Sequence, residues 1–378
     1  MLSIIGTYAR KEKLKMIHTT HKLTPEQKEN LFQQHKDLIY MIYCCNGYML
    51  RRQIRKFFHL LSGREEMDIE FDITELILTG FLLQKTINKD TRTQMLYLSK
   101  YPKSKFMNVE RSGDVPAIFW SNTKIFEHIF RVDYILEKVI PDMQEQHYQI
   151  DMDNIITYLQ WTGSNLLLSS NQSDMLTFYN NLGVTLQDNN YTLSHDFLRD
   201  MEIAQYDKDS FEANQLKKSS ELPPCVAKIR RDKEADSYNS DIEKYKQFYH
   251  LKNFAAHGFY IESMIGNTIN LCYFDSQDNL QTKKLYQQLC YILLMFQRYT
   301  NNYNIELHVT VYVWDKERAE HLRTEENKKA FDFYRQEWVE ENKKYKVMKD
   351  IGLLRQYWDS ITTTYTSEEI YPKYNVHL

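Results

Sequence analysis

Glycine and proline are scarce in this chain, which has 10 glycines and 7 prolines among its 378 residues. An average protein contains about 7% glycine and about 5% proline. Because phosphate-binding loops and tight turns depend on glycine, the sequence disfavours a glycine-rich nucleotide site and a turn-dense all-β fold. Long helices with few breaks are favoured instead. Aromatic residues make up 14% of the chain, which excludes disorder over most of it because they supply large buried surfaces.

Cysteine is also scarce and poorly spaced for bridging. The five cysteines form no CxxC motif, and their number is odd: Cys44, Cys45, Cys225, Cys272 and Cys290. We therefore expect neither a disulfide framework nor a cysteine zinc site. His18 and His21 have no third ligand near them, so we expect no metal and no cofactor. The P-loop, GxGxxG, GxSxG and HExxH motifs are absent, and the sequence does not indicate an enzyme.

Long hydrophobic runs are missing too. No stretch approaches the roughly 18 apolar residues that span a bilayer. The first 16 residues place an apolar start before Arg10, Lys11, Lys13 and Lys15, which is the reverse of a signal peptide. We expect a cytoplasmic protein with no membrane partner.

The charges are unevenly distributed along the chain. Residues 1–105 hold 18 Lys and Arg but only 11 Asp and Glu, whereas the remainder holds 30 and 40. A basic N-terminal third on an acidic body is typical of a nucleic-acid-binding module attached to another part. Chance clustering of surface charge is the alternative.

Residues 23–110 predict three helices followed by a β-hairpin. Thr24 and Pro25 begin the first helix, and the apolar residues of the next two recur at helical spacing. The expected elements are helices at about 24–45, 50–61 and 66–79 and strands at 81–87 and 93–99. This order predicts a winged helix-turn-helix.

The rest of the chain completes a helix-dominated α+β protein. Residues 111–205 predict a helical middle, with a hairpin at 183–193 that would make it a second, degenerate winged helix; an unrelated helical connector is the alternative. Residues 206–240 are polar and predict a linker or mobile loop. Residues 241–320 predict a small α/β unit whose crossover helix returns to a parallel strand. Residues 321–378 predict a charged helix and an aromatic tail.

Basic side chains in the first region form a candidate DNA surface. Four of them lie on the second helix opposite its apolar stripe, and two lie in the hairpin turn: Arg51, Arg52, Arg55, Lys56, Lys89 and Arg92. Such clusters contact backbone phosphates of double-stranded DNA. The alternative is a solvated basic face.

The third helix opposes this interpretation, because residues 65–75 are strongly acidic. Acidic side chains repel phosphates, so this segment also predicts a protein partner. A second copy of the chain is one candidate partner.

Carboxylates in the α/β unit raise a nuclease alternative. Asp275 ends one expected strand and Glu262 lies on the strand before it, as metal-binding nucleases require. No Glu-x-Lys pair follows on a strand, which argues against an active nuclease. A nuclease fold with an unrecognised metal site is kept as an alternative.

The segments 51–58, 77–82 and 96–99 resemble the N-terminal winged helix of replication-relaxation-type proteins, which are encoded by plasmids and integrative elements of Gram-positive bacteria. The resemblance implies a DNA-binding role in replication, transfer or regulation of a mobile genetic element. The alternatives are the nuclease-fold enzyme and an interaction or structural factor whose winged helix binds a protein.

Overall fold

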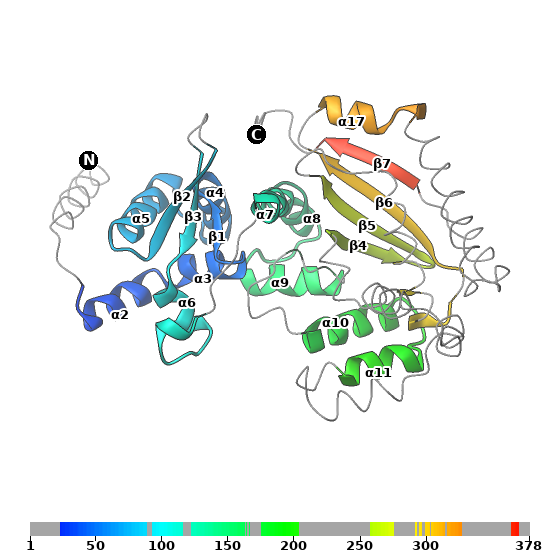
Figure 1. The fold of residues 1–378 in the computed structure, drawn as a ribbon, viewed down its shortest axis with the longest axis horizontal. Coiled ribbons are helices and arrows are strands. Elements are labelled where there is room, and N and C mark those ends of the chain that lie inside the picture. Colours follow the sequence, from blue (N-terminus) through cyan, green and yellow to red (C-terminus); the bar gives the residue numbers. More distant parts are fainter. Residues whose placement is uncertain are drawn as a thin grey trace, which may run out of the picture. The chain divides into compact units, whose positions relative to one another are not determined.

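The computed structural model describes residues 23–88, 93–115, 122–162, 164, 166, 175–203, 258–275, 292, 295–296, 299–302, 304–313, 316–326 and 364–369. They divide into two compact units (Figure 1). The first unit contains the described residues up to Thr157 together with Leu166, and the second contains the others. Both are helix-rich and carry a small sheet, which confirms the α+β class. None of the described helices combines the length and hydrophobicity needed to cross a membrane.

Two short helices stand where the sequence predicted one. α2 (Pro25–Gln34) begins as expected, because the Thr24 hydroxyl accepts a hydrogen bond from the Gln27 amide and the Gln27 side chain accepts one from the Thr24 amide. His35, with φ −113° and ψ 18°, interrupts the helix, and α3 (Lys36–Cys44) follows. The interruption places His35 at the corner between α2 and α3.

A three-stranded sheet completes this part of the first unit. The elements follow in the order β1 (Tyr48–Leu50), α4 (Arg51–Ser62), α5 (Glu66–Leu78), β2 (Leu82–Asn88), β3 (Thr93–Leu98) and α6 (Lys100–Phe106). The sheet order is β1-β3-β2, and both pairings are antiparallel. The hairpin prediction is confirmed. The sequence missed β1 and α6, and the predicted wing residues Lys89 and Arg92 lie outside the described residues.

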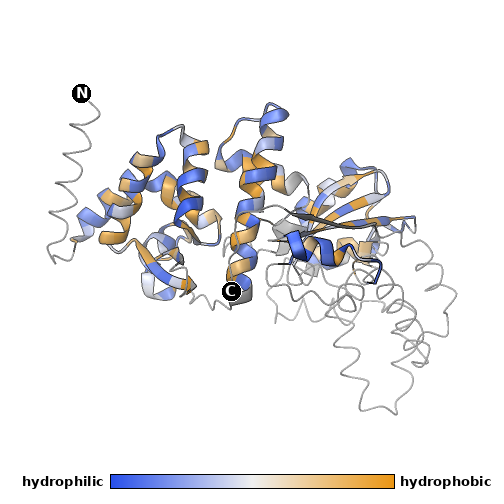
Figure 2. Cartoon of the chain, turned by 90° about the horizontal axis from the view of Figure 1, so that it is seen from above, coloured by the Kyte–Doolittle hydropathy of each residue, from blue (hydrophilic) through white to orange (hydrophobic). Residues whose placement is uncertain are grey.

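Apolar stripes hold the first unit together. The expected core faces of α4 and α5 are buried, with Ile54, Phe57, Ile69 and Ile73 fully enclosed. Figure 2 shows hydrophobic and hydrophilic faces along the helices. The adjacent Cys44 and Cys45 are buried free thiols in this core.

A helical layer follows within the first unit and contains a π-helical turn. The elements are η1 (Ser112–Asp114), α7 (Asn122–Tyr134), the π segment η2 (Ile135–Val139), α8 (Ile140–Glu145) and α9 (Met152–Trp161), whose end passes into the second unit. The Ile140 amide donates to the carbonyl of Ile135, five residues back. Pro141 accounts for this widening, because its ring lacks an N–H and would clash with the carbonyl of Glu137.

The second unit is built on a mixed sheet. Its elements are α10 (Met175–Asp188), α11 (His195–Ile203), β4 (Phe259–Ile265), β5 (Thr268–Asp275), β6 (Glu306–Val313), α17 (Lys316–Leu322) and β7 (Thr364–Glu369). The sheet order is β4-β5-β6-β7; β4 is antiparallel to β5, and the other pairs are parallel. The predicted return to a parallel strand is confirmed by the pairing of β5 with β6, and β7 was missed. The linker predicted at 206–240 lies outside the described residues.

The hairpin predicted at 183–193 is wrong. α10 runs through Gly183 to Asp188, and Asn190, with φ 64°, makes the turn that follows. Gly183 is a packing position, because an added Cβ would lie 3.2 Å from the ring of Phe197 on α11. The predicted second winged helix therefore lacks the hairpin on which that interpretation depended.

Candidate functional site

The basic side chains of α4 lie opposite its buried stripe, as expected. Their exposed fractions range from 30% for Arg52 to 43% for Lys56. Each of the four lies within ion-pair distance of a carboxylate from another element of the first unit. Solvent therefore reaches this face, but its charges already have partners.

Two of these side chains join α4 to α5. Arg51 Nε donates to Glu70 Oε1 at 2.6 Å, and its Nη2 donates to the hydroxyl of Thr74 at 2.8 Å. Arg55 Nε lies 3.5 Å from the second oxygen of Glu70. One acidic residue of the third predicted helix thus holds two of the predicted DNA contacts.

The other two join α4 to the layer of α7. Arg52 donates to both carboxylate oxygens of Asp133, which has a fully buried side chain. Gln53, also buried, donates to Asp133 Oδ1 at 2.8 Å and to the carbonyl of Ile129 at 2.7 Å. Lys56 pairs with Glu137 in the π segment. These contacts dock α7 and η2 on the polar side of α4.

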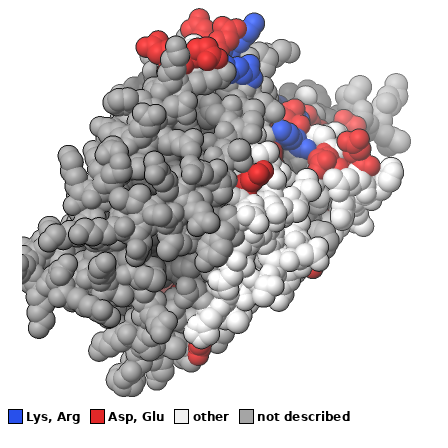
Figure 3. All heavy atoms as spheres, turned by 90° about the vertical axis from the view of Figure 1, so that its right-hand side faces the viewer, with Lys and Arg blue, Asp and Glu red and all other residues white. Residues whose placement is uncertain are grey.

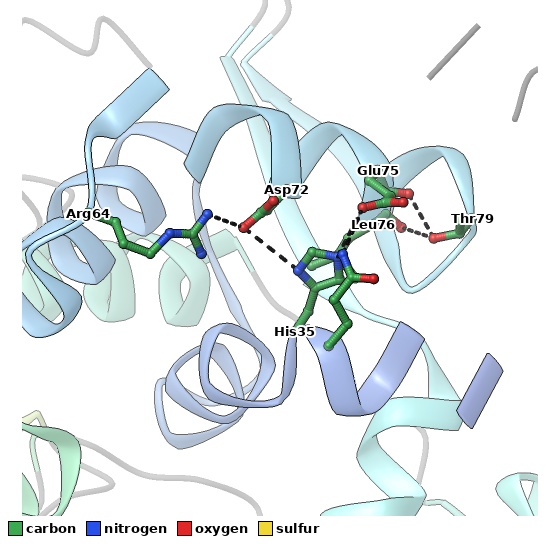
Figure 4. A network of polar contacts seen from close by, with 7 residues as sticks. His35, Arg64, Asp72, Glu75, Leu76 and Thr79 are labelled. Atoms are coloured by element: carbon green, nitrogen blue, oxygen red, sulfur yellow. Dashed lines mark hydrogen bonds and ion pairs between the residues drawn. The ribbon is translucent and has the colours of Figure 1, made fainter. Parts of the chain in front are cut away.

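Two acidic residues of α5, Asp72 and Glu75, turn inward (Figure 4). Asp72 accepts from Arg64 Nη2 at 2.6 Å, and Glu75 Oε2 lies 3.1 Å from Nε2 of His35. Together with the Glu70 contacts, these pairs engage the carboxylates in the middle of the helix. The apparent conflict between a basic second helix and an acidic third helix is therefore largely an intramolecular match of opposite charges.

The outer face of α5 is apolar. Met67, Phe71 and Leu78 follow one another at spacings of four and seven, and they stand opposite the buried stripe of Ile69 and Ile73 on a helical wheel. Met67 is 67% exposed, and Phe71 and Leu78 are half-buried. We call these three residues the outer stripe. A surface helix normally carries polar residues there, so the outer stripe is unusual for a solvent-facing helix face.

Acidic residues flank the outer stripe at the start of the helix. Glu65 and Glu66 are exposed next to Met67. They also lie at the positive end of the helix dipole, which stabilises them there. Sequence reasoning noticed the acids but missed the outer stripe, although its spacing was a readable signal.

A buried lysine lies beside the turn that precedes β1. Lys103 on α6 is 6% exposed, and an added Cβ at Gly47 would lie 2.9 Å from its Cε atom. Burial lowers the pKa of this ammonium group to about 8. Gly47, with φ 77°, thus provides both the turn and the space for the lysine.

The carboxylates of the nuclease alternative do not form a common site. Arg318 donates twice to Asp275 Oδ2, at 2.9 and 2.7 Å, and the Asp275 side chain is fully buried. Glu262 instead accepts from the hydroxyl of Tyr312 at 2.8 Å. A metal ion at Asp275 would have to compete with the guanidinium of Arg318.

Figure 3 views the molecule from the right-hand side of Figure 1, and the charged side chains coloured on that face are mostly Asp and Glu. The described residues there form no basic surface.

Comparison with protein-family models, with curated proteins and with solved structures finds no match to this chain.

Proposed function

We propose that the first unit is a winged-helix module that binds a partner protein through the outer stripe of α5. The element order from α2 to β3 and the sheet order β1-β3-β2 support the winged-helix assignment. In that motif the helix at the position of α5 is the one that meets the ligand.

The single observation that carries the proposal is the chemistry of that helix. Its outward residues are Met67, Phe71 and Leu78, with Glu65 and Glu66 beside them. Base edges are read by hydrogen-bonding side chains, and phosphates are held by cations. An apolar stripe with an acidic flank instead fits a protein segment that has apolar side chains next to Lys or Arg.

DNA binding, as part of replication, transfer or regulation of a mobile element, is the second candidate. The excess of Lys and Arg in residues 1–105 favours it, as do Lys89 and Arg92 at the expected wing. The ion pairs of α4 weigh against it, because phosphates would have to displace Glu70, Asp133 and Glu137.

A displayed library of random 16-residue peptides, selected on the full chain, tests the proposal. We expect the enriched peptides to combine apolar residues with Lys or Arg. The affinity of these peptides should fall at least about tenfold for Met67→Glu and for Phe71→Glu, because a charged side chain then faces the apolar side chains of the peptide. Val184→Glu is the matched control, because Val184 is 49% exposed on α10 of the second unit.

Enrichment that survives both α5 variants, or the absence of any enriched peptide, would count against the proposal. Titration of duplex DNA across a salt series tests the second candidate. Contacts by all six predicted residues require a slope of log K against log salt of about −5, at roughly −0.9 for each phosphate. Self-association that depends on Met67 would identify a second copy as the partner.

A further inference from the structure

His35, Asp72 and Glu75 bring three potential metal ligands together inside the first unit (Figure 4). One nitrogen or oxygen from each residue lies within 4.8 Å of the others. The residues are 4%, 8% and 8% exposed, so the cluster is enclosed by the fold. It is the only such group among the residues that the structure describes.

A fourth polar group converges on the same point. The side-chain amide nitrogen of Gln34 lies 3.2 Å from His35 Nε2 and 3.5 Å from Glu75 Oε2, and these two atoms are 3.1 Å apart. Ligands about 2.1 Å from one metal ion lie roughly 3.0–3.4 Å from each other in octahedral or tetrahedral geometry. The three atoms therefore have the spacing of one face of a coordination shell. Turning the Gln34 amide by 180° presents its oxygen there.

The two carboxylates face opposite nitrogens of the His35 ring. Asp72 Oδ2 lies 3.7 Å from Nδ1 and accepts a hydrogen bond from Arg64 Nη2 at 2.6 Å, whereas Glu75 Oε2 lies 3.1 Å from Nε2. Because one ion binds one nitrogen of an imidazole, the ligand atom is Nε2, and Asp72 orients the ring from the Nδ1 side.

We propose that His35 Nε2, Glu75 and Gln34 form a binding site for a divalent transition metal ion of the zinc class, with Asp72 orienting the His35 ring from the Nδ1 side. An imidazole nitrogen beside a carboxylate oxygen suits Zn²⁺ better than Ca²⁺ or Mg²⁺, which prefer oxygen ligands alone. Such an ion fixes the corner between α2 and α3 against α5. The site is independent of the partner-binding proposal, because it lies on the inner side of α5.

The test uses the untagged full chain after removal of metal by a chelator. We expect one equivalent of Zn²⁺ to bind with a micromolar or tighter Kd and to raise the thermal midpoint by at least about 5 °C. Glu75→Gln should lose that equivalent. A double variant, His18→Ala with His21→Ala, should retain it, which separates this site from the histidine pair near the N-terminus.

Co²⁺ provides a readout that does not depend on a variant folding. Binding at this site should give visible d–d bands without the thiolate charge-transfer band that Cys44 or Cys45 would produce. Absence of metal binding by the wild-type chain overturns the proposal and leaves His35 as a polar bridge between two carboxylates. Binding that Glu75→Gln retains, or a thiolate band, overturns it as well.

Discussion

Arg52 on α4 donates one hydrogen bond to each carboxylate oxygen of Asp133 on α7, at 2.8 and 2.6 Å. This two-point geometry is the strongest form of an arginine–carboxylate pair. Because the Asp133 side chain has no solvent-exposed surface, the ion pair reaches into the interior of the first unit. It makes a residue predicted to contact DNA into part of the packing between two helical layers.

Replacing Arg52 should destabilise the first unit far more than replacing Arg51. Arg52→Ala removes two charged hydrogen bonds from the buried Asp133, and we expect a loss of about 3 kcal/mol. Arg51→Ala removes a pair whose two side chains are 37% and 28% exposed, so we expect a loss below about 1 kcal/mol. Hydrogen exchange of the α4 amides measures both. Equal losses of stability would show that the pair with Asp133 contributes no more than the exposed pair with Glu70.

Local patterns predicted most of the described fold. The apolar spacing in α4 and α5 specified buried stripes, and alternation specified β6, because helix and strand periods depend on neighbours along the chain. Short elements and elements far from their partners in the sequence were not predicted. β1 has three residues, and β7 pairs with β6 from far along the sequence. The hairpin prediction at 183–193 failed because α10 continues through Gly183, where glycine makes room for Phe197, a long-range requirement that no local pattern contains.

The candidate site was predicted less well than the fold. The sequence placed the four basic side chains on one face of α4 correctly, but it could not show that Glu70, Asp133 and Glu137 meet them. The last two belong to a layer more than 70 residues away. The acidity of α5 was read as a surface property, whereas Asp72 and Glu75 face His35 and Arg64.

Glu70→Gln should strengthen non-specific DNA binding. The change frees Arg51 and Arg55 from one carboxylate and leaves the shape of the side chain intact. Two released guanidinium groups can engage up to two phosphates, so the slope of log K against log salt should steepen by about 1–2. Titration of labelled duplex DNA at several salt concentrations measures this.

Glu66→Gln is the matched control for that experiment. It removes the same charge from the same helix, but Glu66 is exposed at the first turn and holds neither arginine. If both variants change the slope equally, general electrostatics accounts for the result and the pairing with Glu70 does not.

Gly183→Ala should destabilise the second unit although alanine is the better helix former. The new Cβ would lie 3.2 and 3.3 Å from two carbons of the Phe197 ring, which is closer than ordinary contact. Overpacking costs about 1–3 kcal/mol, and the gain in helix propensity returns up to about 1 kcal/mol. Thermal denaturation should show a lower midpoint. Gly113→Ala meets nothing within 4 Å and should leave the midpoint within about 2 °C.

Lys103 should make the stability of the first unit rise between about pH 8 and pH 10.5. Burial lowers the pKa of its ammonium group from 10.5 to about 8 in the folded chain, whereas the unfolded chain keeps the ordinary pKa. Between these two pH values the unfolded state binds more protons than the folded state, so stability increases with pH. Below pH 8 both states are protonated and the full cost of burying the charge is present.

Lys103→Met should remove this dependence and stabilise the unit at pH 7 by up to about 3 kcal/mol, at roughly 1.4 kcal/mol for each pKa unit. The comparison must be made between the two proteins at each pH. Burial also raises the pKa of Cys44 to about 12 and that of Tyr48 to about 12, and these groups lower stability at alkaline pH in both proteins. Hydrogen exchange of slowly exchanging α3 amides, corrected for pH, gives the difference. A constant difference between pH 7 and pH 10.5 would show that Lys103 keeps its ordinary pKa in the folded chain.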